Sequence, residues 1–528
     1  MPIDRHSSNW LTTPIVRCRT REEQTAILSL PAVYALLMVD GISSFPALRP
    51  HQKQPLHAFL VQVGALALVA AKSTTPPDTA DDWRVLLRGL TPHFVDDEPW
   101  CLVVDDLSKP ALLQPSIPEG TIDALKDSED TPDALDMLVT SKNHDLKGAR
   151  MRHAAADEWL FALITLQTME GFLGAGNYGI SRMNGGFASR PSVGIATLGG
   201  FGARVRRDMQ RLIEIRGEAM AANEYYARER GLGLTWLIPW DGVQHLQPRE
   251  LDPYYVEVCR RIRLVERDGA LMARRGSSKA ARIAFPKGYN GVTGDPWAPL
   301  NRADGDPKSL TVDGAGFHYR RVADILDPES FTPAPLQVAV GGDGTASLVL
   351  TLAATARGQG ETQGHHERTI HVPPKAVRFF GAGAGDALAR LARERVGQAG
   401  EMRNRVLKPA LLTLFQNQPE KLDYKHVASN RKSDIFLSAL DREIDHIFFD
   451  DLFFELSEDD HDVRDQIRRD WLLRLKAIAQ AQLATAEAGS PISHVRRYMS
   501  RAAAESRLSS AFFAAFAPYF PKARGTTP

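Results

Sequence analysis

The chain has 528 residues, of which 64 are basic and 64 acidic, so its formal net charge is zero. At roughly 150 residues per domain this length predicts two or three domains. The composition, 43% hydrophobic and 24% charged, is typical of a globular protein and argues against a mostly disordered chain. It also argues against a protein that grips nucleic acid by its overall charge, because such proteins are usually basic.

Cysteine content and apolar runs bear on the compartment and on cofactors. Cys18, Cys101 and Cys259 form no CxxC pair and are too few for a disulfide framework or a four-cysteine zinc site. The first ten residues contain no apolar core, so we expect no secretory signal. The longest apolar stretch, 55–71, is shorter than the ~20 residues that a membrane span needs. We therefore expect a cytoplasmic protein with no cofactor and no membrane partner.

The neutral total hides two stretches of opposite charge. Residues 76–136 carry 15 acidic and 4 basic side chains, whereas residues 141–211 carry 10 basic and 5 acidic ones. Two interpretations remain open. The stretches are either two solvated surfaces, or the second one forms a basic site for a polyanion.

The first part of the chain mixes helical and β-like segments. Residues 26–39 and 56–70 are apolar runs of helical length, and the residues of 154–170 follow the spacing of a helix. WCLVV at 100–104 predicts a short strand. Between about 230 and 375, β-like runs such as LQVAV and ASLVLTL alternate with Gly, Pro and Asp turns, which predicts a sheet-rich region.

After residue 375 the pattern becomes helical. Four helices are predicted, at 384–416, 433–456, 460–487 and 491–517, with apolar stripes typical of an antiparallel bundle. Pro409 is expected to kink the first of them. The expected fold class is α+β: a large mixed α/β domain over 1–375, followed by a C-terminal four-helix bundle over 376–528.

Residues 174–179 match the glycine pattern G-x-G-x-x-G. A dinucleotide fingerprint requires a preceding strand and an acid about 20 residues further on. Here a helix precedes the pattern and no acid follows, so we reject that interpretation. Either this is an ordinary surface loop, or it hugs a phosphate backbone or a base-pair edge. Arg182, in the same excursion, would then contact a phosphate.

Two histidine-containing clusters favour a different class of function. His144 and Asp145 in one, and His365 and His366 in the other, could seed a metal-dependent nuclease. Each cluster alone supplies too few suitably spaced ligands. The chain also lacks a GxSxG elbow, a phosphate-binding P-loop and an HExxH motif. We therefore predict no enzyme, and keep the nuclease as the alternative.

Seven stretches, taken in chain order, resemble one protein family. They are FPALRPHQ (45–52), HAFLVQVGALAL (57–68), PALLQPSIPEG (110–120), TSKNHDLKGAR (140–150), SRMNGGFASRP (181–191), GDPWAP (294–299) and RGQGETQGHHER (357–368). Together they are similar to CasA, the large subunit of the type I-E CRISPR surveillance complex called Cascade. The helical C-terminal third also fits that family's four-helix bundle.

The resemblance implies a non-catalytic subunit for DNA recognition. Such a subunit reads a protospacer-adjacent motif on double-stranded DNA and helps unwind the duplex for R-loop formation. It also recruits a helicase-nuclease, while base pairing with CRISPR RNA reads the remaining sequence. The implied partners are CRISPR RNA, target double-stranded DNA, the helicase-nuclease, and the backbone, small and RNA 5′-end-binding subunits of Cascade.

The resemblance also assigns roles to particular residues. Gln363 is similar to the wedge that splits the first base pair, and Lys287 is the candidate for a lysine in the minor groove. With Arg182, the predicted DNA-contacting set is Gly174, Gly176, Asn177, Tyr178, Arg182, Lys287, Thr362, Gln363 and Gly364. The predicted set for RNA and complex docking is Lys142, Asn143, His144 and Lys147.

The chain departs from the family pattern in its cysteines and in its glycine loop. Its three scattered cysteines cannot build the zinc cluster of some relatives, and Asn177 and Tyr178 stand where other members have more glycine or a lysine. The second departure leaves the motif preference open. A purely structural bundle protein is a third hypothesis, under which Gln363→Ala would leave DNA opening unchanged.

Overall fold

The computed structural model describes residues 8–118, 120, 122–136, 154–303, 305–343, 346–358, 361–416, 421–489 and 494–520. The chain divides into two compact units. Unit 1 comprises Met1–Phe317 and Glu329–Ile370, and unit 2 comprises His318–Pro328 and His371–Pro528. The expected domain boundary was placed after residue 375. The structure also assigns 318–328 to unit 2, which the sequence did not indicate.

The core of unit 1 is built around α2 (Lys53–Ala70). It is apolar on nearly all sides and therefore buried on nearly all sides. Its neighbours are α3 (Ala80–Arg88), α6 (Ala156–Met169) and α7 (Phe201–Glu214). From α1 (Leu30–Met38), the Tyr34 hydroxyl donates to the Leu60 carbonyl of α2 at 2.7 Å. Among the described residues, the stretch Pro50–Ala70 is long and apolar enough to cross a membrane, but 83% of its most apolar window is buried inside the protein. This stretch serves as a core helix of unit 1.

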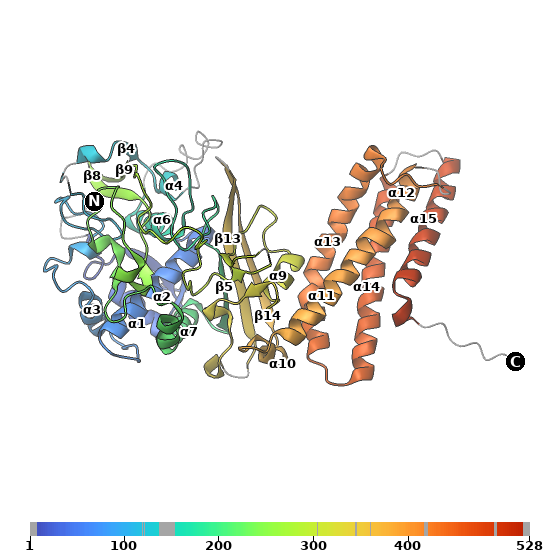
Figure 1. Ribbon diagram of the computed structural model, residues 1–528, viewed down its shortest axis with the longest axis horizontal. Helices are drawn as coiled ribbons and strands as arrows, with labels where there is room; N and C mark the ends of the chain where they lie inside the picture. The colour runs from blue at the N-terminus through green and yellow to red at the C-terminus, as the bar shows by residue number, and fades with distance from the viewer. Residues whose placement is uncertain are drawn as a thin grey trace. The chain divides into compact units, whose positions relative to one another are not determined.

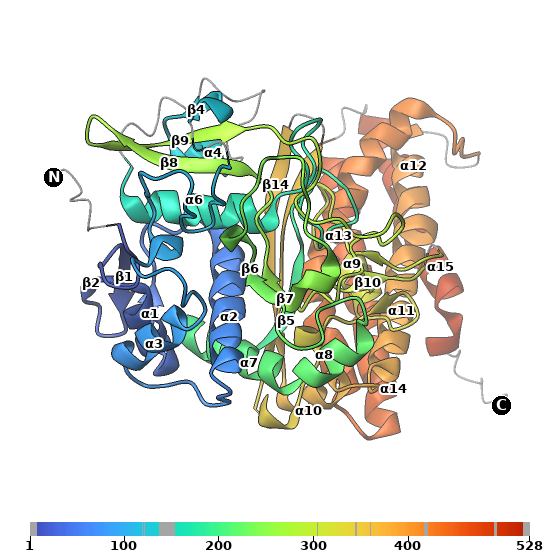
Figure 2. The same ribbon diagram turned by 60° about the vertical axis from the view of Figure 1, so that its left-hand side comes forward.

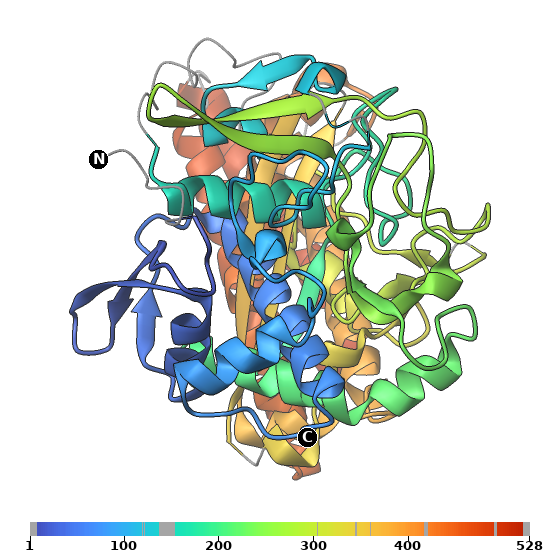
Figure 3. The ribbon, with the colours of Figure 1, turned by 90° about the vertical axis from the view of Figure 1, so that its left-hand side faces the viewer.

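The main sheet of unit 1 has the order β14-β13-β5. It consists of β5 (Ser192–Thr197), β13 (Leu348–Gly358) and β14 (Glu361–Val372). β5 and β13 are antiparallel, with Leu348 opposite Thr197 and Ala353 opposite Ser192. A second hairpin, β8 (Arg261–Arg267) and β9 (Ala270–Gly276), lies over α6, and α6 crosses one end of α2 (Figures 2 and 3).

The remaining elements of unit 1 are short. One small sheet is formed by β1 (Val16–Thr20), β2 (Thr25–Leu28) and β3 (Ile42–Ser44), and β4 (Asp127–Glu129) pairs with β9. The others are α4 (Pro132–Leu135), α8 (Arg216–Ala222), β6 (Leu232–Leu234), β7 (Leu251–Val256), β10 (Leu300–Asn301), β11 (Lys308–Ser309) and β12 (Phe331–Thr332).

Unit 2 is a helical bundle (Figure 1). Its long helices are α11 (Asp386–Glu401), α12 (Lys408–Gln416), α13 (Val427–Leu456), α14 (His461–Ala488) and α15 (His494–Ala515); α9 (Tyr319–Ile325) and α10 (Pro374–Val377) are short. The predicted stripes Leu437, Leu440 and Ile444 on α13, and Leu472, Leu475 and Ala479 on α14, are buried. The α+β class is confirmed.

The predicted irregularity at Pro409 is present as a π-helical segment. The π-helical segment Met402–Leu407 joins α11 to α12, and Pro409 is the second residue of α12. Proline has no amide hydrogen, and its ring crowds the carbonyl four residues earlier, within the π segment, so the α-helical hydrogen-bond pattern is interrupted there. The first predicted helix is therefore two α-helices joined by a π turn.

Three local predictions were wrong. Residues 98–100 form a 3-10 turn, and Cys101 makes only an isolated bridge to Asn9, so WCLVV is no strand. LQVAV begins in a 3-10 turn, Pro335–Gln337, instead of a strand. The apolar run 26–39 is split into β2 and α1, with Ser29 as the residue before the helix. Apolar content alone does not distinguish a short strand from a buried turn.

Unit 1 is expected to lose stability as the pH falls from 6.5 to about 4. His57 on α2 is fully buried, and its Nε2 lies 2.8 Å from Oδ2 of Asp208. Burial, together with the positive charge of Arg204, lowers the pKa of His57 from 6.5 to about 4. In this window His57 is neutral in the folded state but protonated in the unfolded state, so its contribution to the free energy of unfolding falls on acidification, by up to about 3 kcal/mol.

Thermal unfolding followed across this pH range tests the prediction. His57→Gln keeps a donor near the position of Nε2 but does not titrate. The variant should therefore show a flatter dependence of Tm on pH between 6.5 and 4. The same slope in both proteins would show that His57 is not the responsible group.

Candidate nucleic-acid interface

The glycine-rich excursion follows α6 and begins with a closed turn. The Leu173 N–H donates to the Asn177 carbonyl and the Asn177 N–H donates to the Gly174 carbonyl, both at 3.0 Å. Gly174 has φ +114° and Gly176 has φ +85°, which only glycine adopts without strain. The Gly176 carbonyl accepts a hydrogen bond from the Ser278 N–H at 3.0 Å. The predicted loop is thus an ordered turn, closed by its own backbone and attached to the end of β9.

Asn177 and Tyr178 occupy the second half of this turn and are half-buried. The Tyr178 ring lies 6.0 Å from the Phe172 ring, between centroids. Its carbonyl accepts a hydrogen bond from Arg260. Both residues remain partly accessible, as the predicted DNA-contacting role requires.

Arg182 is not placed as predicted. Its side chain is 1% exposed, its guanidinium lies 4.0 Å above the Tyr255 ring, and its Nη2 donates to the carbonyls of Pro253 and Tyr255 at 3.1 Å. Here it cannot reach a phosphate on a duplex. Its place in a short basic run suggested exposure, but the aromatic ring and the two carbonyls hold it in the interior. We therefore withdraw Arg182 from the DNA-contacting set.

The other arginines of the basic stretch, 141–211, are also at least partly buried where the structure describes them. Arg190 pairs with Asp295 and Arg207 with Asp343. These two ion pairs are buried, and no arginine in the described part of the stretch is fully exposed, so this part presents no cluster of exposed arginines to a polyanion.

Thr362, Gln363 and Gly364 lie at the start of β14 instead of within a turn. They follow residues 359–360, which separate β14 from β13. Gln363 is exposed. A Cβ on Gly358 would lie 3.0 Å from Gln363 Nε2, and one on Gly314 would lie 3.4 Å from its Oε1. The amide thus sits between two residues that have no side chain.

Residues 309–314 connect the glycine excursion to Gln363. Asn184 Nδ2 donates to the Ser309 carbonyl at 3.1 Å, and a Cβ on Gly186 would lie 3.9 Å from Thr311 Cγ2. Five residues after Ser309, Gly314 borders Gln363. The structure therefore brings the 181–191 stretch and the Thr362–Gly364 stretch to one region of unit 1.

Lys287 is exposed in a turn that also adjoins this region. The turn is closed by a hydrogen bond from the Tyr289 N–H to the Pro286 carbonyl at 3.2 Å. Nearby Gly291 has φ +76°, and a Cβ on it would lie 2.6 Å from the Met183 backbone. Lys287 is thus carried on a segment packed against the excursion. Lys142, Asn143, His144 and Lys147 lie outside the described residues.

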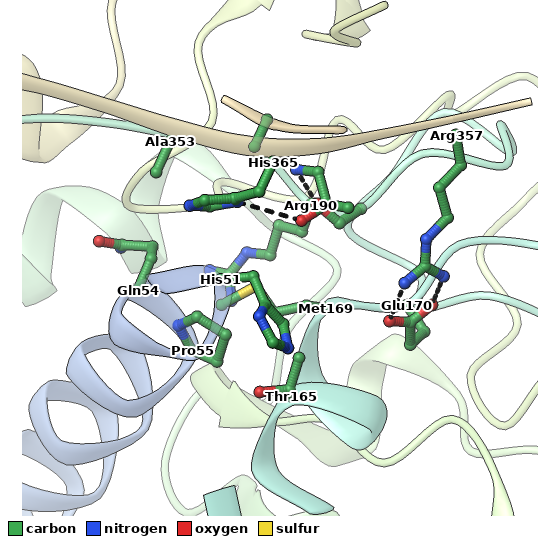
Figure 4. A pocket seen from close by; sticks show the side chains of 13 residues that line it. His51, Gln54, Pro55, Thr165, Met169, Glu170, Arg190, Ala353, Arg357 and His365 are labelled. Carbon is green, nitrogen blue, oxygen red and sulfur yellow. Dashed lines mark hydrogen bonds and ion pairs between the residues drawn. The ribbon is translucent and has the colours of Figure 1, made fainter. Parts of the chain in front are cut away.

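His365 and His366 do not form one metal half-site. As consecutive residues of β14 they point to opposite faces. His365 lines a small cavity with His51 and Gln54, and its Nδ1 lies 3.2 Å from Thr355 Oγ1 (Figure 4). Burial lowers the pKa of His365 to about 4. His366 instead lies against Gly316.

The same cavity contains a buried ion pair between Arg357 and Glu170, whose Nη2 to Oε1 distance is 2.9 Å (Figure 4). Both carboxylate oxygens of Glu170 therefore already accept hydrogen bonds from Arg357. Among the described residues, no group of three or more His, Cys, Asp or Glu side chains could hold a metal ion. The other two residues of the nuclease hypothesis, His144 and Asp145, lie outside the described part of the chain.

Two residues that hold the glycine turn, Glu257 and Arg260, were not predicted from the sequence. Glu257 accepts hydrogen bonds from Ser181, and Arg260 donates to the carbonyls of Gly171 and Tyr178. Both follow β7, about 80 residues after the turn, and belong to no motif. Only the three-dimensional structure connects them to it.

These features define a class of protein. An α+β unit carries an ordered glycine turn and a glutamine at the start of a strand, and a helical bundle follows it in the chain. No protein-family model and no curated protein matches the chain. Solved structures do. The chain has the fold of the CRISPR-associated proteins called Cse1 or CasA.

Three of these structures show how far the similarity extends. Cse1 from Acidimicrobium ferrooxidans has a TM-score of 0.64 at 14% identity, covering 97% of this chain and 99% of that chain. A CasA from Thermus thermophilus gives 0.63 at 14%, with 96% and 99% coverage. Cse1 from Thermobifida fusca gives 0.65 at 13%, with 98% and 100% coverage. The similarity thus spans both units.

Proposed function

We propose that this chain is the large subunit of a type I-E CRISPR RNA-guided surveillance complex, Cascade. The observation that carries the proposal is the fold. Structures of Cse1 and CasA match 96–98% of the chain, and 99–100% of their own length is covered. A match from end to end supports the same role in a complex better than a match to one shared domain would.

In the proposed role, unit 1 reads the protospacer-adjacent motif and helps to open the duplex. The Gly174–Gly176 turn brings backbone close to a groove, and Asn177, Tyr178 and Lys287 supply polar groups beside it. The minor groove distinguishes mainly A·T from G·C, so such contacts give relaxed reading of a short motif. Thr362, Gln363 and Gly364 would form the wedge, with the Gln363 amide replacing a stacked base pair.

The proposal also names partners. CRISPR RNA, the remaining Cascade subunits and the helicase-nuclease would assemble around this cytoplasmic chain, with Lys142, Asn143, His144 and Lys147 as the docking residues. The chain itself would catalyse no reaction. Purified alone with Mg²⁺ or Mn²⁺ it should leave DNA and RNA intact, and metal-dependent cleavage that is lost in His144→Ala would favour a nuclease instead.

Gln363→Ala is expected to slow duplex opening about tenfold or more. A wedge offsets an unstacking cost of a few kcal/mol, and alanine cannot replace the lost stacking surface. The measurement is the fluorescence of 2-aminopurine placed beside the motif, in Cascade assembled with this chain and CRISPR RNA. Gln244→Ala, another exposed glutamine in unit 1, is the matched control and should open DNA normally. Normal opening by Gln363→Ala would favour a purely structural role.

A further inference from the structure

The short connection between β7 and β8 contacts both ends of the glycine turn. Glu257 accepts from the Ser181 backbone N–H at 2.7 Å through Oε1, and from the Ser181 hydroxyl at 2.8 Å through Oε2. Arg260 donates from Nη2 to the Gly171 carbonyl at 2.9 Å and from Nη1 to the Tyr178 carbonyl. The Glu257 carboxylate therefore fixes the segment 171–181 at Ser181, and the Arg260 guanidinium fixes it at Gly171 and Tyr178.

The connection is itself fixed to the core helix α6. Gln167 Oε1 accepts from the N–H groups of Cys259 and Arg260 at 3.0 and 2.8 Å, and its Nε2 donates to the Arg260 carbonyl at 3.0 Å. Gln167 is fully buried. The chain of contacts thus runs from α6 through Gln167 and Arg260 to the glycine turn.

Glu257 and Arg260 are 4% and 3% exposed, so neither can contact a duplex directly. Burying a charged side chain is costly unless its polar atoms are satisfied. Both side chains direct hydrogen bonds to the segment 171–181, and Arg260 binds two backbone carbonyls there. Burial raises the pKa of Glu257 to about 7, so its carboxyl group is only partly ionised near neutral pH. The hydrogen bonds from the Arg260 guanidinium are charge-assisted, and such bonds are roughly twice as strong as neutral ones.

We propose that Glu257 and Arg260 are positioning residues that hold the turn at 171–181 in its DNA-reading conformation and thereby set motif selectivity. This inference rests on the proposed function. A preorganised loop loses its conformational entropy during folding and not during binding. The binding free energies of correct and incorrect motifs then differ by the full difference between their contacts. A mobile loop would adapt to several motifs, and the difference in affinity between them would shrink.

The test measures duplex affinity in Cascade assembled with the full chain, using a library of duplexes randomised at the motif. Arg260→Met removes both carbonyl contacts, and it should reduce the ratio between best and worst motif at least tenfold. Arg260→Lys keeps the charge and should recover part of the ratio. Arg267→Met, an exposed arginine at the end of β8, is the matched control and should leave the ratio unchanged.

The outcomes separate this inference from the proposed function. If the unmodified chain confers no motif-dependent binding, the proposed function fails. If it does so and Arg260→Met lowers affinity for all motifs equally, or changes nothing, the positioning role is wrong.

Hydrogen exchange of the isolated chain gives a second, binding-independent readout with Glu257→Leu, which removes both acceptors of the Ser181 hydrogen bonds. Faster exchange confined to 171–181 is expected, and unchanged exchange there would overturn the inference.

Discussion

Arg190→Met is expected to lower the free energy of unfolding of unit 1 by about 3–5 kcal/mol, the usual cost of leaving a buried charge without its partner. Arg190 donates from Nε and Nη2 to both carboxylate oxygens of Asp295, at 2.5 and 2.7 Å, and the two side chains are 3% and 0% exposed. Asp295 also accepts from the Trp297 N–H at 2.9 Å. The pair joins the 181–191 stretch to the 294–299 stretch.

Urea unfolding followed by tryptophan fluorescence measures this loss, because every tryptophan except Trp471 lies in unit 1. Arg19→Met, also in unit 1, is the control. Its partner Glu23 is 3.5 Å away, but the two side chains are 51% and 70% exposed. An exposed pair contributes about 0–1 kcal/mol, so this variant should unfold almost normally. Similar small losses in both variants would contradict the interpretation of Arg190 and Asp295 as a buried clamp.

Gly176→Ala is expected to weaken duplex binding about 100-fold. A left-handed backbone costs an L-residue roughly 1–2 kcal/mol. A Cβ on Gly176 would in addition lie 2.8 Å from the Ser277 Cβ, so the turn must move away from β9. Overpacking of this kind costs about 1–3 kcal/mol. The strain is local, so the far-ultraviolet circular dichroism of the chain should not change.

Two further variants separate strain from contact. Gly174→Ala places a Cβ in open space at φ +114°, so it should show the strain effect alone and a smaller loss of binding. Ser277→Gly, added to Gly176→Ala, removes the close contact and should recover about tenfold in affinity if the contact is worth about 1.4 kcal/mol. Equal losses in the two alanine variants, with no recovery, would show that the approach to Ser277 is unimportant.

The helices were predictable from the sequence because their signal is local. The stripes on α13 and α14 repeat every three to four residues, and this spacing alone identifies the buried face. The pairing of strands in the sheet was harder to predict from the sequence. β5 pairs with β13, about 150 residues away, so its pairing depends on a partner that no local pattern reveals. Short strands and short 3-10 turns, such as those at 100 and 336, have similar apolar content.

The candidate site shows the same division. The glycine pattern and Gln363 could be predicted from the sequence. Unusual backbone geometry requires glycine at particular positions, and Gln363 lies in a stretch that resembles a family motif. The burial of Arg182 could not be predicted, since an arginine over a tyrosine ring has the same local sequence as an exposed arginine. Glu257 and Arg260 were also invisible, because their role depends on contacts across about 80 residues of chain.

The most direct test of the proposed function is binding of motif-containing duplex by a type I-E Cascade that lacks its own large subunit and is supplied with this chain. The cognate Cascade, assembled with CRISPR RNA, should bind matched duplex only when this chain is present. Binding should also depend on the motif beside the target and produce an open R-loop. Failure of the chain to join the complex, or binding that ignores the motif, would contradict the account.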